Sequence, residues 1–158
     1  MSIPTDSERT APLSVARQAW LSERLAQEPD VRRGRFPFRD TTLARADIEW
    51  LLSDLPAAGL DLRGAILRGG DLESLSLTGV LLGLAHRDWV HATQEERRSA
   101  AADLSGADLR NARLDRAELS SARLESANLI GARLNGARAA AAIFEHANLS
   151  LATCNGAV

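Results

Sequence analysis

The feature that most constrains this chain is a period of five residues that begins at residue 102. From there alanine returns at every fifth position as far as Ala157, and the residue two places later is leucine in eight of the eleven complete units. The exceptions at this third position are Ala139, Phe144 and Cys154. Such regularity indicates a repeat architecture, in which each short unit packs against its neighbours instead of building a core of its own.

A shorter block with the same period occupies residues 60–84. Its third positions are all leucine, whereas its first positions vary more in size. The separation between residues 60 and 102 is not a multiple of five, so the two blocks are out of register. Residues 85–101 are therefore predicted to be an insertion. Within it, Thr93 and Glu96 have the spacing of a capping box, which predicts a short helix.

A period of five fits neither an α-helix nor a β-strand, so each unit must combine a short extended piece with a turn. The first and third positions then face a narrow interior, where alanine tolerates a tight corner and leucine fills the axis. The other positions are rich in Asp, Asn, Arg, Ser and Gly. We expect these residues to face water and to form the turns.

The tandem pattern A-(D/N)-L-x-x resembles the pentapeptide repeat family over residues 60–84 and 102–158. The resemblance implies a mainly β fold, the right-handed quadrilateral β-helix, with four units per coil and the third residue and the one two before it pointing inward. Sixteen complete units would form about four coils, with residues twenty apart stacked at a strand spacing of about 4.8 Å. This register predicts that Cys154 is buried in the core. Leu60 departs from the family pattern, which has a small residue at the first position.

The first third of the chain does not follow the period and is expected to form a helical cap. Apolar residues recur at helical spacing between Leu13 and Leu25, with Ser14 as a candidate N-cap, and a second helix is predicted from Ala44 to Leu55. The segment at residues 36–40 is more typical of a strand. The expected division is a flexible tail (1–12), a helical N-terminal cap (13–59), a first repeat block (60–84), an insertion (85–101) and a second repeat block (102–158).

The two ends of a β-helix expose unpaired backbone and apolar side chains unless something covers them. Trp20, Trp50 and Trp89 all lie outside the repeats. We expect them to seal the first coil and to clamp the insertion against the rod. The other end stops at Val158 without a helical or aromatic cap, so we expect it to be adhesive.

No catalytic, cofactor-binding or metal-binding constellation is predicted. His86, His91 and His146 do not stand at metal-ligand spacing, and no glycine-rich loop is followed by the Lys-Ser/Thr pair of a phosphate site. The acidic residues of the repeats belong to positions that face water. The sequence therefore favours a protein that is not an enzyme and that has no cofactor.

Two groups of outward-facing residues are candidate contact surfaces. Arg113 and Arg133 should stack on one face with Arg116 nearby, where they could bind an anionic partner or simply extend into solvent. Ile130, Leu151 and Val158 are apolar and near the C-terminal end. They form a candidate self-association surface, with isolated exposed apolar residues as the alternative.

The charge balance disfavours direct nucleic-acid binding, since 19 arginines face 21 acidic residues and the net charge is −2. A single cysteine excludes an internal disulfide. The start of the chain lacks the pattern of a signal peptide, and no apolar run is long enough to span a membrane. These features favour a soluble, cytoplasmic protein.

The sequence leads to two functional hypotheses. The first is a non-enzymatic scaffold that binds a protein partner of unknown identity and forms a homodimer or higher assembly through its C-terminal coil. The alternative comes from the resemblance, because some pentapeptide repeat proteins imitate duplex DNA and protect gyrase from quinolones or toxins. That role would favour a strongly acidic rod, whereas residues 102–158 carry six acidic residues and six arginines.

Overall fold

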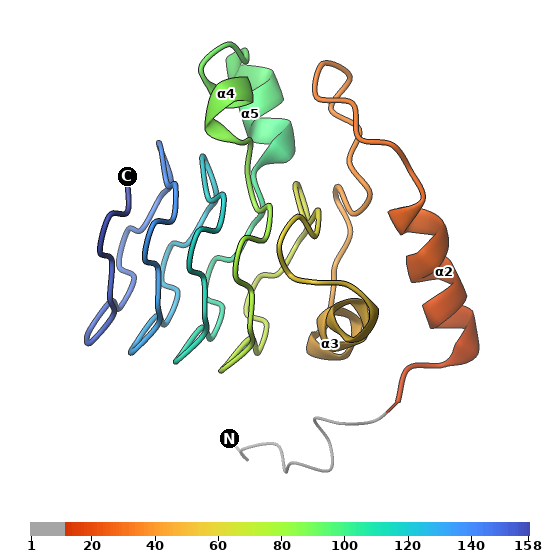
Figure 1. Ribbon diagram of the computed structural model, residues 1–158, viewed down its shortest axis with the longest axis horizontal. Helices are drawn as coiled ribbons and strands as arrows, with labels where there is room; N and C mark the ends of the chain where they lie inside the picture. Colours follow the sequence, from red (N-terminus) through yellow and green to blue (C-terminus); the bar gives the residue numbers. More distant parts are fainter. Residues whose placement is uncertain (1–11) are drawn as a thin grey trace.

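The computed structural model describes residues 12–158, which form a rod of stacked coils with helices at one end and on one side (Figure 1). The helices are α2 (Val15–Leu25), α3 (Arg45–Asp54), α4 (His86–Trp89) and α5 (Gln94–Ala100). In this part of the chain the coils contain single-residue bridges and no extended strands. The repeat solenoid is thus confirmed, and its β character consists of short parallel contacts between coils. The expected flexible tail falls almost wholly on residues 1–11, which lie outside the described residues.

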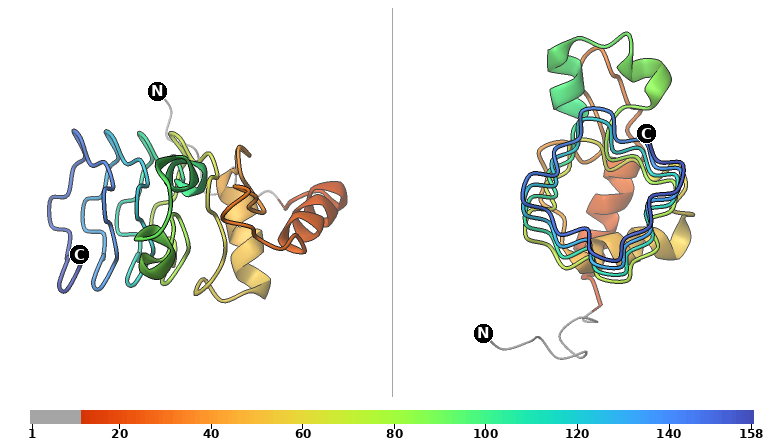
Figure 2. Two further views of the ribbon diagram at one scale, coloured as in Figure 1. Left: turned by 90° about the horizontal axis from the view of Figure 1, so that it is seen from above. Right: turned by 90° about the vertical axis from the view of Figure 1, so that its left-hand side faces the viewer.

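Parallel bridges set the register between coils. Within the second block they join residues twenty apart, such as Asp103 with Arg123 and Arg123 with Ile143. Each bridge has two backbone hydrogen bonds: the Leu104 N–H donates to the Arg123 carbonyl at 2.7 Å, and the Arg123 N–H donates to the Ala102 carbonyl at 3.0 Å. Seen along the rod, the coils superimpose (Figure 2). The predicted stacking of residues twenty apart is therefore confirmed.

The second position of the repeat owes its preference for Asp and Asn to the turn that follows. The side-chain oxygen of Asp103 accepts a hydrogen bond from the Ser105 N–H at 3.0 Å, and Asn148 does the same for Ser150. Such local acceptors stabilise a turn at its own backbone. The chain then passes through a left-handed residue, which is glycine at Gly106, with φ of 68°.

Leucine and alanine at the inward positions fill the axis of the rod. Leu104, Leu109 and Leu129 are fully buried, as is the first-position residue Ala107. The prediction that Cys154 is buried was wrong, because this thiol belongs to the last coil and is exposed. Among residues 12–158, none stacks beyond that coil to cover its inward side chains.

Helices α2 and α3 lie at the N-terminal end of the rod, as predicted. Ser14 accepts a hydrogen bond from the Arg17 N–H and so caps α2. The carboxylate of Asp47 in α3 accepts from the Ala44 N–H and forms a bidentate pair with the Arg17 guanidinium, with N–O distances of 2.8 and 2.9 Å. Leu21 is completely buried in the same core as the repeats. Trp20 and Trp50 are partly buried and also pack against that core.

The strand expected at residues 36–40 is absent, and the segment forms a turn like those of the repeats. Phe38 and Leu43 are buried five residues apart. The Thr41 N–H donates to the Phe38 carbonyl at 3.0 Å, which matches the hydrogen bond from Ala107 to Leu104 within the repeats. The repeat therefore begins before residue 60, but its first units lack the alanine that identifies the others.

The insertion at residues 85–101 stands on the side of the rod (Figure 1). Thr93 and Glu96 form the predicted capping box at the start of α5, while the short α4 was not predicted. The Trp89 indole N–H donates to the Ser121 hydroxyl at 3.0 Å, which fastens the insertion to the coil that follows. Among residues 12–158 no helix is both long and apolar enough to cross a membrane.

Candidate binding surfaces

The three arginines singled out in the sequence lie together on one side of the rod. Arg113 and Arg133 form a parallel bridge and are exposed, and Arg116 occupies the turn of the same unit as Arg113. Arg133 pairs with Asp115 at 3.2 Å. Within residues 12–158 Arg113 and Arg116 have no carboxylate within ion-pair distance, so two cations of this group are uncompensated.

The three apolar candidates do not share one environment. Leu151 is 85% exposed and Val158 is 78% exposed, both in the last turns of the chain. Ile130 is half-buried and lies in the preceding coil, with its N–H held by the Asn128 side chain. The large exposed apolar side chains of the last coil are therefore Leu151, Val158 and the partly exposed Ile143 and Leu149.

The backbone of the last coil forms an open edge. In the preceding coil the N–H groups of Leu124, Leu129 and Leu134 donate to carbonyls of the last coil at 2.7–2.8 Å. The equivalent N–H groups of the last coil belong to Phe144, Leu149 and Cys154, and they have no acceptor within residues 12–158. Sequence reasoning anticipated both unpaired backbone and exposed side chains here, and the structure identifies the three backbone donors.

Most charges on the rod faces are paired within or between coils. Arg138 binds Glu118 at 2.8 Å, and Arg123 lies 3.7 Å from Asp103. Burial raises the pKa of Asp103, but hydrogen bonds from Ser105 and Arg68 and the charge of Arg123 outweigh it, so its pKa lies below the usual value. The faces consequently carry no continuous acidic stripe.

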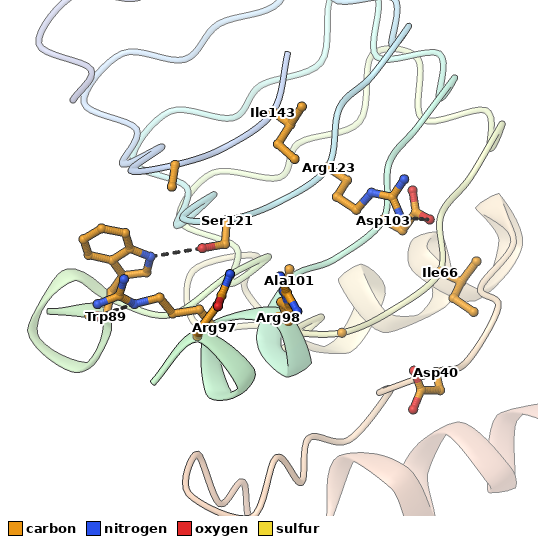
Figure 3. A pocket seen from close by; sticks show the side chains of 13 residues that line it. Asp40, Ile66, Trp89, Arg97, Arg98, Ala101, Asp103, Ser121, Arg123 and Ile143 are labelled. Carbon is orange, nitrogen blue, oxygen red and sulfur yellow. Dashed lines mark hydrogen bonds and ion pairs between the residues drawn. The ribbon is translucent and has the colours of Figure 1, made fainter. Parts of the chain in front are cut away.

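A groove lies between the insertion and the rod, and sequence reasoning missed it (Figure 3). Its volume is about 720 Å³, and residues from α5 form one wall while residues of successive coils form the floor. Trp89 and the pair Arg97–Arg98 in the insertion were the only signal available in the sequence. Their placement over the rod depends on tertiary contacts that no local pattern specifies.

The three histidines are not brought together. His86, His91 and His146 are all exposed, and the part of the chain that the structure describes has no group of three side chains able to hold a metal ion.

Comparison with known proteins connects the repeats to a family. A family model described as pentapeptide repeats matches eight copies over residues 102–138 and 127–157. Similar solved structures include HetL, a pentapeptide repeat protein involved in heterocyst differentiation regulation from Nostoc sp. strain PCC 7120. The two chains are 36% identical over a match that covers 58% of this chain and 35% of HetL, with a TM-score of 0.37.

Two further structures have lower identity. QnrB1, a plasmid-mediated fluoroquinolone resistance protein, is 16% identical, with 62% of this chain and 47% of QnrB1 covered and a TM-score of 0.38. Rfr23 from the cyanobacterium Cyanothece 51142 is 24% identical, with 58% of this chain and 85% of Rfr23 covered and a TM-score of 0.34. The chain spans about a third of HetL and about half of QnrB1. No curated protein matches it.

Proposed function

The chain belongs to the pentapeptide repeat family, and we propose that it is a non-enzymatic binding scaffold that pairs with a second copy of itself through its C-terminal coil. The observation that carries this proposal is the open backbone edge of that coil, where Phe144, Leu149 and Cys154 have unpaired N–H groups. In this proposal the rod is a right-handed β-helix of about four coils, and its N-terminal helices act as a cap.

A second copy suits this edge for two reasons. An edge of β-type backbone presents donors and acceptors in alternation, so it can pair with the same edge of another molecule turned through half a rotation. The exposed side chains of Leu151 and Val158 lie beside that edge and would be removed from water in the same contact. Both features favour a symmetric contact between identical surfaces.

The opposite end of the rod limits the size of the assembly. Leu21 of α2 and Ile48 of α3 are fully buried against the core, so this end does not present an equivalent open edge. One adhesive end per molecule produces a closed dimer, whereas two would produce a filament. We therefore infer a homodimer with the N-terminal helices at its two outer ends.

The sides of the dimer would remain available to an outside protein. Arg113 and Arg116 have uncompensated charges on one face and would suit an acidic surface on that partner, with Arg133 beside them. A cytoplasmic location belongs to this proposal, supported by the single cysteine. The DNA-mimicking alternative gains no support from charge, because carboxylates such as Glu118 are paired with arginines.

Size-exclusion chromatography with light scattering over a dilution series tests the dimer. The variant Leu151→Lys/Val158→Lys places two charges at the open end, and we expect it to be a monomer at concentrations where the unchanged chain is a dimer. The matched control Val15→Lys/Val90→Lys adds the same charge at exposed positions far from that end and should remain a dimer. An unchanged chain that is monomeric at every concentration, or a dimer in both variants, would contradict the proposal.

A further inference from the structure

The groove beside the insertion has the dimensions and lining of a small-molecule site. Its volume of about 720 Å³ falls within the usual range for ligand pockets. The floor includes Ile66 and Ile143 from different coils, and the Ser121 hydroxyl lies beside the Trp89 ring, whose indole N–H donates to it (Figure 3). A ligand here would contact apolar side chains along the rod and the edge of the indole ring.

The positive charge of the groove is in excess on the side formed by the insertion. Asp103, on the floor, already pairs with Arg68 and Arg123, and Asp40 pairs with Arg39 at 3.2 Å. Within residues 12–158, Arg98 has no ion pair and no side-chain hydrogen bond. The wall formed by α5 therefore offers positive charge that the floor does not neutralise.

The second arginine of this wall is held in place by Trp89. The Arg97 guanidinium carbon lies 4.1 Å from the centre of the indole ring, and its Nε donates to the Trp89 carbonyl at 3.0 Å. Its terminal nitrogens have no carboxylate partner among the described residues. A guanidinium that is stacked and fixed loses little side-chain entropy when it binds an anion, because its orientation is already set.

From these contacts we propose that the groove binds a small organic anion, which carries one carboxylate, phosphate or sulfonate group on an apolar body. The anionic group contacts Arg98 and the free nitrogens of Arg97. The apolar body lies along Ile143 and the Trp89 ring. In this proposal the insertion adds a ligand site to the side of the repeat rod.

The probe for this site is 1-anilinonaphthalene-8-sulfonate, which combines a sulfonate with aromatic rings. We expect saturable binding to the Leu151→Lys/Val158→Lys variant, whose apolar end is disrupted, and a shift of the Trp89 indole N–H resonance without comparable shifts at Trp20 and Trp50. Competition by 1-naphthyl phosphate and 1-naphthylacetate then distinguishes a phosphate ligand from a carboxylate. Uncharged 1-naphthol should compete weakly.

Arg98→Gln is the decisive variant, since it removes the exposed charge and leaves the Arg97–Trp89 contact intact. We expect it to weaken sulfonate binding about tenfold, which is a common effect of losing one charge-assisted hydrogen bond. Arg32→Gln is the matched control, because Arg32 is also exposed and lies outside the groove, and this variant should leave affinity unchanged. Equal affinity in both variants, or binding that leaves the Trp89 resonance unmoved, would overturn the proposal.

Discussion

Single side chains at repeated positions determine the course of the backbone in this rod. An Asp or Asn at the second position accepts the N–H two residues later, as Asp103 does for Ser105, and the leucine that follows turns inward. Both roles were readable from the sequence, because turn chemistry and burial act within one unit. The exposure of Cys154 was not readable, because it depends on whether another coil covers it.

Replacing Leu129 with aspartate tests the interior register. Leu129 is completely buried, so the change places an unpaired carboxylate in the dry axis and should cost about 4 kcal/mol or more. Asn128→Asp is the neighbouring control, since Asp108 and Asp71 already occupy the same stacked position. Urea denaturation should show a large loss for the first variant and a small one for the second. Equal losses would show that the register is wrong.

Substitution of Gly83 tests how closely two neighbouring coils approach each other. A Cβ at this position would overlap the carbonyl oxygen of Ser120 in the next coil, so Gly83→Ala should destabilise the rod by about 3 kcal/mol. Gly70→Ala is the contrast, because Gly70 is a first-position residue where alanine is standard and the nearest atom to an added Cβ is 3.1 Å away. Thermal melts that fail to separate the two variants would contradict the close approach.

At the scale of the elements, two helices could be predicted from local sequence signals, whereas the groove could not. Ser14 and the Thr93–Glu96 pair mark helix starts that short-range capping explains, so α2 and α5 were predictable. The turn at Phe38 was mistaken for a strand because only two early units share the repeat spacing. The groove arises from the docking of α5 against several coils, which is a tertiary property.

The pair of Arg17 and Asp47 should make the attachment of α2 dependent on pH. Burial opposes ionisation of Asp47, but the hydrogen bonds from Arg17 and Ala44 outweigh it and hold its pKa below the unfolded value of 3.8. The stabilisation is therefore complete above that value and is lost as pH falls through the lower folded pKa. Thermal melts of Asp47→Asn should show a lower midpoint at neutral pH and a weaker dependence between about pH 5 and 2.

Glu28→Gln is the control for this measurement, since Glu28 is exposed and has no ion pair in the described chain. Its melting profile should follow that of the unchanged protein across the same pH range. A profile of Asp47→Asn that keeps the full acid dependence would show that this carboxylate does not link the helices in solution.

At the scale of the whole molecule, helices α2 and α3 lie at one end of the rod and the last coil, with its unpaired backbone N–H groups, lies at the other (Figure 2). Its period, insertion and helical beginning were all predictable, because a repeat specifies its own stacking once the number of units per coil is set. The open end combines exposed Leu151 with unpaired backbone in the last coil, and this combination is what the proposed dimer uses.

Amide hydrogen exchange measured at low and high protein concentration tests this dimer most directly. The account predicts that the N–H groups of Phe144, Leu149 and Cys154 exchange quickly in dilute solution and slow by about tenfold or more as pairs form, while Leu124 stays protected throughout. Fast exchange of the three amides at every concentration would contradict pairing through the C-terminal coil.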